Sequence, residues 1–360
     1  MPLPASFLPV QVGVAGLGRS GIYHVERIGL RDDCRVVALY DDCSTARDRA
    51  GVEAAPMYSR WDEFLADPHV ELVLLATPPA HHAEPAIQAL AAGKHVIVET
   101  PLGLNLAEAD ALIAAGARAG RSVCVAHTRR WDDDFCTAQQ ALAGGELGRP
   151  LSMKFINWHY NPRARRESRD LGTQSQSAEE HSRLGPVDWR RHTQTGGGVL
   201  WEFGIHYFDQ LLLLAGRLPL TVYGRVFPSE SGEPFDDGFL AIVTFSDHLV
   251  AHVEVHRTAA AGLPTGWTII GDRGSYAGFT QYTPTPEGEI VDVPLTRVSV
   301  DADDFYQEVI RHIRTGAPNP VPAAQARPVI ALIEAVRRSA RSGQVVPFEA
   351  EWSVSEIRIR

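Results

Sequence analysis

Short apolar runs alternate with helix-like segments over the first third of the chain. Two segments between the runs, residues 85–93 and 106–120, space their apolar positions as a helix does. Continuous apolar strands separated by helices are typical of a parallel sheet that is covered on both faces. The pattern therefore predicts a doubly wound α/β domain. Its expected strands are residues 10–16, 35–41, 71–77, 95–99 and 122–126.

The pattern changes after residue 126, where strand-like runs follow one another with few helices between them. Tight turns such as Ser246-Asp247-His248 join some of these runs, which predicts a largely antiparallel sheet in an α+β domain. We therefore divide the chain into residues 1–126 and 127–360. The strands expected in the second part are residues 151–158, 220–228, 238–246, 248–257 and 267–279.

Three further segments of the second part have distinct patterns. Two late helices are expected at about 303–315 and 325–342, and they are candidates to pack back on the first domain. A polar stretch with little periodicity fills residues 161–195. Loops of that length are usually lids, binding loops or oligomer arms.

Composition and charge exclude several classes of protein. A chain of 360 residues is too long for one ordinary core, and its 44% hydrophobic and 22% charged residues are typical of a soluble globular protein. A net charge of −10 disfavours nucleic-acid and membrane partners. No apolar run reaches the ~18 residues of a membrane helix, and the start lacks the features of a secretory signal.

The four cysteines show neither a CxxC pair nor another zinc spacing. We expect reduced thiols in a cytoplasmic protein, and no metal site.

The first expected strand runs into a glycine turn, Gly16-x-Gly18-x-x-Gly21. In a strand-to-helix turn the first glycine permits the bend, the second lets a pyrophosphate approach the backbone, and the third permits close helix packing. The helix N-terminus then offers free N–H groups to the anion. Arg19 and Ser20, at the start of that helix, complete the predicted turn. The alternative is a glycine-rich turn without a ligand.

An acid in the right place makes the dinucleotide interpretation stronger. The second expected strand ends on Asp41, about 20 residues after the last glycine, where the ribose-binding acid is found in such domains. A carboxylate there accepts the 2′-hydroxyl and repels a 2′-phosphate, so we expect NAD rather than NADP. Asp42 adds to the repulsion, whereas Arg47 opposes it.

A second informative segment covers residues 196–216, where three glycines precede a helix that is apolar almost all round and is therefore expected to be buried. Glu202, His206 and Asp209 have the spacing i, i+4 and i+7, which would form one polar stripe. Buried ionisable groups are costly unless they are paired or used, so a general base, His206, with a supporting acid is plausible. A buried ion pair and a metal pair without a third ligand are the alternatives.

Further polar candidates follow the predicted strands. Thr77, Pro78 and His82 come just after the strand at 71–77, on the cofactor face, and Glu99-Thr100-Pro101 ends the strand at 95–99. The segment His127-Thr128-Arg129-Arg130 lies where the first domain ends. Groups suited to a polyol or ring-hydroxyl substrate, among many ligands, end the strand at 151–158: Asn157, Trp158, His159 and Tyr160. Trp189, Arg190 and Arg191 come just before the three glycines, where the arginines could bind a phosphate or carboxylate or simply be solvated.

Together these stretches resemble the Gfo/Idh/MocA family, named after glucose–fructose oxidoreductase, inositol dehydrogenase and rhizopine catabolism. The matching stretches include "VGVAGLGRSGIYH", "ATPPAHHAEPAIQALAAGKHVIVETPLG", "VAHTRRW", "DWRRHTQTGGGVLWEFGIHYFD" and "IIGDRGS". The resemblance implies a Rossmann domain and an α/β domain with a large open sheet, which often makes homodimer or homotetramer contacts. It also implies NAD(P)-linked alcohol–ketone interconversion on sugars or cyclitols.

The resemblance assigns roles residue by residue. His206 matches the usual catalytic histidine, and Glu202 holds a position commonly occupied by aspartate. We therefore predict His206, Glu202 and Thr100 as catalytic. The predicted substrate contacts are Trp158, Tyr160, Trp189, Arg190, Arg191 and His206. The predicted cofactor contacts are Gly16, Gly18, Arg19, Ser20, Gly21, Asp41, Asp42, Thr77, Pro78, His82, Glu99, Thr100 and Arg129.

One position departs from the family pattern, because Glu99-Thr100-Pro101 replaces the usual Glu-Lys-Pro. The family lysine contacts the reacting oxygen, whereas threonine donates one hydrogen bond and carries no charge. Losing a preorganised electrostatic contact of this kind typically costs about 10²–10³ in rate.

Three interpretations follow from this departure. The chain is a dehydrogenase in which Thr100 and one of Arg129, Arg130, Arg190 and Arg191 replace the lysine. Alternatively, it recycles a tightly bound NAD within one turnover, for epimerisation, elimination or deglycosylation. In the third, it binds NAD and a ligand without turnover, as a sensor or partner subunit.

Overall fold

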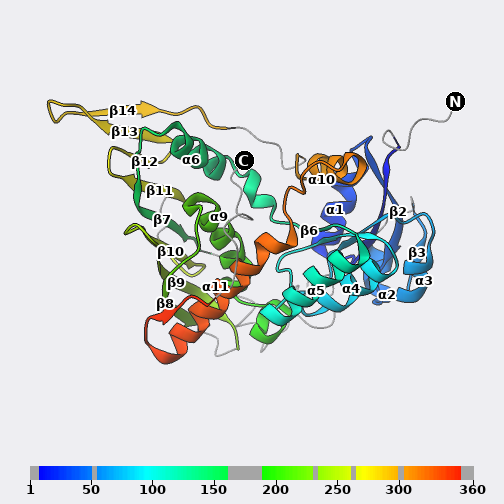
Figure 1. Ribbon diagram of the computed structural model, residues 1–360. Coiled ribbons are helices and arrows are strands. Elements are labelled where there is room, and N and C mark those ends of the chain that lie inside the picture. Colours follow the sequence, from blue (N-terminus) through cyan, green and yellow to red (C-terminus); the bar gives the residue numbers. More distant parts are fainter. Residues whose placement is uncertain are drawn as a thin grey trace.

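The computed structural model describes residues 8–50, 55–160, 189–229, 234–260, 265–298 and 304–349. Two sheets form the cores of two neighbouring parts of the molecule, which Figure 1 shows side by side. No helix in these described ranges is long and apolar enough to cross a membrane.

The first sheet has six parallel strands in the order β3-β2-β1-β4-β5-β6. The strand order reverses between β1 and β4, and ligands bind at such a switch point, beyond the carboxyl ends of the strands. The central strands are buried on both faces, as their continuous apolar sequences predict. The strands are β1 (Val10–Ala15), β2 (Cys34–Tyr40), β3 (Met57–Tyr58), β4 (Leu72–Leu75), β5 (His95–Val98) and β6 (Val123–Val125).

Helices cover both faces of this sheet. Right-handed crossovers on either side of the switch point place α1 on one face and α4 and α5 on the other. α5 shows the local signals for its ends: Asn105 accepts a hydrogen bond from the N–H of Glu108 at its start, and Gly120 ends it with φ 59°. The helices are α1 (Arg19–Gly29), α2 (Ser44–Ala50), α3 (Trp61–Ala66), α4 (Ala83–Ala91) and α5 (Leu106–Ala119).

The second sheet has nine strands in the order β14-β13-β12-β11-β7-β10-β9-β8-β15. One pair, β7 with β10, is parallel and the others are antiparallel. The fold class predicted from the sequence, a Rossmann domain and an α+β domain with a large, mostly antiparallel open sheet, is confirmed. The strands are β7 (Pro150–Trp158), β8 (Thr221–Pro228), β9 (Asp236–Thr244), β10 (Val250–His256), β11 (Gly266–Gly271), β12 (Ser275–Ala277), β13 (Thr280–Pro284), β14 (Ile290–Pro294) and β15 (Val346–Pro347).

The single strand expected at 267–279 is wrong. The structure divides it into β11 and β12, which pair with each other across a turn in which the N–H of Gly271 donates to the carbonyl of Gly274. The sequence Asp272-Arg273-Gly274 has turn chemistry that outweighs the apolar residues around it.

Side chains alternate between the two faces of the second sheet. In β10, Ala251, Val253 and Val255 are buried, whereas His252 and His256 point to the opposite face and are half-buried. α6, α9 and α11 contact strands of this sheet and cover its apolar face. These helices, with α10, are α6 (Asp133–Gly144), α9 (Ile205–Ala215), α10 (Asp304–Thr315) and α11 (Ala323–Ser342).

The two late helices connect the two parts of the molecule. Figure 1 shows α10 beside α1, where the hydroxyl of Tyr306 lies 2.5 Å from Nδ1 of His24. α11 contacts α5 and β6 of the first part as well as β8 of the second. The predicted domain boundary, between residues 126 and 127, falls just after β6 and stays a prediction.

Candidate active site

The glycine turn after β1 is built as a dinucleotide turn requires. A Cβ atom at Gly16, whose φ is +89°, would lie 2.7 Å from the backbone of Ala76, and a Cβ at Gly21 would lie 1.7 Å from the carbonyl oxygen of Gly16. Gly18, by contrast, has nothing within 4 Å of that position. It precedes α1, whose first turn receives no hydrogen bond from a capping side chain. The turn is therefore closed where the chain packs and open where a pyrophosphate would lie.

Asp41 lies directly beside this turn. Its carboxylate accepts hydrogen bonds from the N–H of Leu17 at 2.7 Å and from that of Cys43 at 2.9 Å. Arg47 donates to the backbone carbonyls of Asp41 and Asp42, at 2.7 and 3.1 Å. The predicted ribose acid and the pyrophosphate turn are thus brought together, while the cation of Arg47 lies close behind the acids.

His82 ties together the segments that follow β4 and β5. Its Nδ1 lies 2.7 Å from the carbonyl oxygen of Pro101, and its Nε2 lies 2.8 Å from that of Thr77. The side chain is 1% exposed, and burial lowers its pKa. Both ring nitrogens of His82 are thus engaged with the carbonyls of Thr77 and Pro101. The role of His82 as a cofactor contact stays a prediction.

Glu99 ends β5 in a network of hydrogen bonds. One oxygen lies 2.8 Å from Nε2 of His24 and the other accepts from the N–H of Thr100 at 3.0 Å. The ring of His24 therefore lies between Glu99 and the hydroxyl of Tyr306. Burial alone would raise the pKa of Glu99, but His24, the N–H of Thr100 and the charge of His206 together outweigh it, and the net shift is downward. The site therefore holds an ionised carboxylate next to Thr100.

The helix expected at 199–214 begins as a π-helix, η7 (Leu200–Gly204), before it continues as α9. Its first turn is held by Asp236, whose carboxylate accepts from the N–H of Leu200 at 2.7 Å. The alignment of Glu202 with His206, and the supporting role of Glu202, stay predictions. Glu202 is 39% exposed and lies 4.0 Å from Nε of Arg190.

His206 is half-buried, at the start of α9. Its Nδ1 is buried and has no hydrogen-bond partner among the described residues. Burial lowers the pKa of His206 to about 3, and the charges of Arg129 and His127 act in the same direction, against the carboxylates of Glu99 and Asp209. The first domain thus contributes Glu99, and the second contributes His206, to one electrostatic centre. The imidazole is neutral near pH 7 and can accept a proton.

The two neighbouring arginines of η3 (Thr128–Trp131) have different environments. Arg130 makes two hydrogen bonds to the carboxylate of Asp209, at 2.8 and 2.6 Å, and a third to Gln325 at 2.7 Å. Arg129 is 40% exposed, lies 3.4 Å from Asp132 and stands over the ring of Tyr207 at 5.8 Å. Arg129 therefore carries the cation that acts most strongly on His206, whereas Arg130 is held by its own partners.

The predicted substrate residues are spread over two segments. Trp158, at the end of β7, has a buried Nε1 without a partner in the described part of the chain, and Tyr160 beyond it is 45% exposed. In η5 (Trp189–Arg191), the guanidinium of Arg190 stacks on Trp189 at 4.3 Å. The side chain of Arg191 and residues 161–188 lie outside the described residues, so the expected role of the 161–195 loop stays a prediction.

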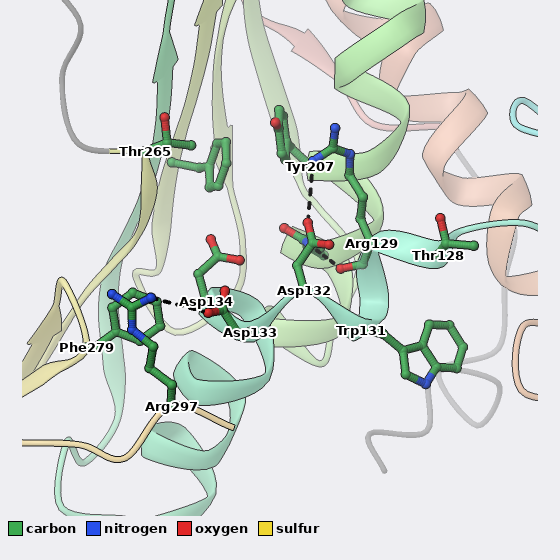
Figure 2. A pocket seen from close by; sticks show the side chains of 12 residues that line it. Thr128, Arg129, Trp131, Asp132, Asp133, Asp134, Tyr207, Thr265, Phe279 and Arg297 are labelled. Carbon is green, nitrogen blue, oxygen red and sulfur yellow. Dashed lines mark hydrogen bonds and ion pairs between the residues drawn. The ribbon is translucent and has the colours of Figure 1, made fainter. Parts of the chain in front are cut away.

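A cavity of about 710 Å³ lies beside Arg129, and the sequence did not predict it. Figure 2 shows Asp132 directed toward Arg129 and Asp133 toward Arg297, which are 3.4 and 3.6 Å apart respectively. Burial raises the pKa of Asp134 to about 6. The consecutive aspartates at the start of α6 are the sequence signal that could have indicated this cavity. The lining residues are Thr128, Arg129, Trp131, Asp132, Asp133, Asp134, Phe155, Tyr207, Gln210, Thr265, Phe279 and Arg297.

Within the described part of the chain, no group of three or more His, Cys, Asp or Glu side chains could hold a metal ion.

Comparison with known proteins agrees with this geometry. Residues 10–127 match the oxidoreductase family with an NAD-binding Rossmann fold, GFO_IDH_MocA, and residues 139–348 match its C-terminal alpha/beta domain. The scyllo-inositol 2-dehydrogenase (NADP(+)) IolW of Bacillus subtilis is 25% identical, over 94% of this chain and 96% of its own. The myo-inositol 2-dehydrogenase of Thermotoga maritima is 28% identical over 74% of each chain.

Among solved structures, an NAD-binding protein from Listeria innocua superposes with a TM-score of 0.80 at 26% identity, covering 97% of this chain and 98% of its own. The family predicted from the sequence motifs is thereby confirmed. The chain belongs to the Gfo/Idh/MocA family of NAD(P)-binding oxidoreductases.

Proposed function

We propose that this protein is an NAD-dependent dehydrogenase that interconverts a secondary alcohol and a ketone on a sugar, a sugar-derived molecule or a cyclitol. The observation that carries the proposal is a neutral, half-buried imidazole, His206, in electrostatic contact with Glu99 at the end of β5 and with Arg129. The inositol dehydrogenases among the relatives support the substrate class.

The residues present fit a dinucleotide. The open position at Gly18 and the N–H groups of the first turn of α1, with Arg19 and Ser20, would hold the pyrophosphate. Asp41 would bind the ribose hydroxyls, and its charge favours NAD, although one relative is named for NADP. The bound nicotinamide would accept the hydride.

His206 would act as the general base on the substrate hydroxyl. Because Nδ1 is buried, Nε2 is the nitrogen that faces the substrate in this proposal. In the oxidation direction His206 takes the hydroxyl proton as the hydride leaves, and in reduction it returns that proton. Its low pKa keeps it unprotonated, the form in which a base acts, over most of the neutral and acidic range.

Arg129 would supply the positive charge that lysine provides in the family pattern. Of the arginines considered from the sequence, Arg130 is bound by Asp209, Arg190 stacks on Trp189, and the side chain of Arg191 is not described. Arg129 is partly exposed and acts directly on His206. In this proposal it stabilises the developing alkoxide, with Thr100 donating a hydrogen bond beside it.

Two expectations about context belong to the same proposal. We expect a cytoplasmic enzyme that acts on a small molecule, without a nucleic-acid partner. We also expect a homodimer or homotetramer that associates through the open face of the second sheet. That face carries exposed apolar side chains, among them Phe227, Val250 and Ile270.

A second candidate function is internal recycling of a tightly bound NAD. The ionised Glu99 beside an uncharged Thr100 favours it, because a fixed negative charge stabilises the cationic, oxidised nicotinamide. A sensor without turnover is the third candidate, and a neutral base in the site has no use there.

One experiment separates the three. The purified protein is screened with NAD and a panel of sugars, sugar acids and cyclitols while absorbance at the NADH band is recorded. Stoichiometric NADH release supports the dehydrogenase. Product formation without added NAD, by protein that already holds the nucleotide, supports recycling instead. Nucleotide binding with neither result supports the sensor and contradicts the dehydrogenase proposal.

A further inference from the structure

His127 is a buried histidine whose ring nitrogens are unpaired in the described part of the chain. It lies between β6 and η3, its side chain is 1% exposed, and neither ring nitrogen has a partner among the described residues. Most buried polar groups in proteins are hydrogen-bonded, and an unpaired one destabilises the fold. An unpaired buried histidine therefore calls for an explanation, such as a function. Nothing in the sequence motifs or in the family comparison gives His127 a role.

A carboxylate lies behind His127. Nδ1 of His127 is 3.8 Å from Oδ2 of Asp209, a distance that a small ring rotation or one water molecule would convert into a hydrogen bond. Asp209 is 3% exposed and is fixed by the two hydrogen bonds from Arg130. The position of the carboxylate is therefore set before any ligand binds.

The other neighbour of His127 is His206. The two rings are perpendicular, with centroids 6.0 Å apart. If Asp209 binds Nδ1 of His127, the buried nitrogens of these two rings that lack partners among the described residues are Nε2 of His127 and Nδ1 of His206. These two atoms complement each other, since one ring can donate and the other accept. Asp209, His127 and His206 therefore lie in succession, in positions from which they could form a chain of hydrogen bonds.

We propose that His127 is the positioning residue for His206: backed by Asp209, it holds His206 in the tautomer with the proton on Nδ1, which leaves the lone pair of Nε2 for the substrate hydroxyl. The proposal rests on the role of His206 proposed above. It gives Asp209 and His127 the supporting function that the sequence suggested for Glu202.

The chain also accounts for the charge that forms in turnover. When the substrate O–H bond breaks, its proton goes to Nε2 of His206, and the hydride from the same carbon goes to the nicotinamide. The resulting imidazolium donates from Nδ1 to Nε2 of His127, which in turn donates from Nδ1 to the carboxylate of Asp209. Arg129 opposes this charge and Glu99 supports it, so a path to a second buried carboxylate stabilises the protonated state.

The tautomer of His206 can be measured without knowing the substrate. Protein labelled with ¹⁵N in its histidines and saturated with NAD is recorded by two-dimensional nitrogen–proton NMR, and the His206 signals are identified by their loss in His206→Asn. We expect His206 to carry its proton on Nδ1 at pH 7. Finding the proton on Nε2, the form that dominates for free histidine in water, overturns the proposal whether or not a variant of His127 folds.

Substitution of His127 tests the cause. His127→Phe keeps a ring of similar size but removes both nitrogens, and we expect the Nδ1-protonated form of His206 to be lost. His127→Gln, which keeps a donor and an acceptor, should retain part of it. The exposed His69→Gln serves as the matched control and should change nothing. An unchanged His206 spectrum in folded His127→Phe contradicts the proposal.

This result is independent of the search for turnover. If no sugar or cyclitol is oxidised but the tautomer depends on His127, the proposed reaction fails and the positioning role holds. If turnover depends on His206 but its tautomer is the same in His127→Phe, the positioning role of His127 is contradicted and the proposed reaction is not.

Discussion

Replacing Arg130 with methionine would remove a buried cation while keeping a side chain of similar length. The guanidinium is 9% exposed and its partner Asp209 is 3% exposed. Burial raises the pKa of Asp209, but the charge and hydrogen bonds of Arg130, together with His127 and His206, outweigh burial and the net shift is downward. Arg130→Met would therefore leave a buried, ionised carboxylate without its main partner, and would also break the hydrogen bonds to Gln325 and to the carbonyl of Pro320.

Breaking one side of a buried ion pair typically costs about 3–5 kcal/mol. We expect a loss in the free energy of unfolding of that size at pH 8. Asp209 would then take up a proton more easily, so the loss should be smaller at pH 5. In the double variant Arg130→Met, Asp209→Leu the carboxylate is gone too, and most of the stability should return, because apolar replacements of both partners are often neutral.

Urea unfolding, followed by circular dichroism at both pH values, measures these differences. Arg217→Met is the matched control, since its partner Asp247 is 64% exposed and exposed pairs contribute at most about 1 kcal/mol. Equal losses for Arg130→Met and Arg217→Met would refute the reasoning. The reasoning would also be contradicted if the double variant lost more free energy of unfolding than Arg130→Met and Asp209→Leu lose when their separate losses are added.

Four other outcomes are expected. His206→Asn should abolish turnover but leave the dissociation constant for NAD, measured by fluorescence titration, nearly unchanged; a parallel loss of binding would place His206 at the cofactor. Asp41→Ala should weaken the binding of NAD more than that of NADP, and equal changes in the two dissociation constants would speak against a ribose contact. Gly21→Ala should eliminate NAD binding in the same titration, because the new Cβ would meet the carbonyl of Gly16 at 1.7 Å; retained binding would show that the turn adjusts. The pKa of His127 is lowered by burial to about 4, so the unfolded chain binds more protons between pH 6.5 and 4, and stability present at pH 7 is lost as the pH falls through that window. His127→Phe should reduce this acid sensitivity by up to roughly 3 kcal/mol in urea unfolding, whereas an unchanged pH profile would contradict a neutral His127.

The nucleotide half of the fold could be predicted from the sequence because its signals are local. Gly16 and Gly21 are required by contacts that no other residue permits, and the strands beside them are apolar throughout. Asp41 follows at the expected separation, and its carboxylate does lie against the turn.

The chemical half could be predicted only in part. His206 was expected from its position on a buried helix, but the π turn before it is held by Asp236, which reaches the N–H of Leu200 from β9. The burial of His127 and its pairing with Asp209 depend on packing between η3 and α9, which no local pattern reports. The cavity beside Arg129 was missed for the same reason, because three aspartates at a helix start also occur as ordinary surface residues.

The order of segments along the chain has a consequence for synthesis. His24 and Glu99 are made early, whereas Tyr306, which completes their network, lies in α10 near the carboxyl end. N-terminal domains generally begin to fold while translation continues. On the ribosome, the glycine turn can therefore form long before the side chains around Glu99 reach their final arrangement, and the nascent enzyme stays incomplete until its last helices emerge.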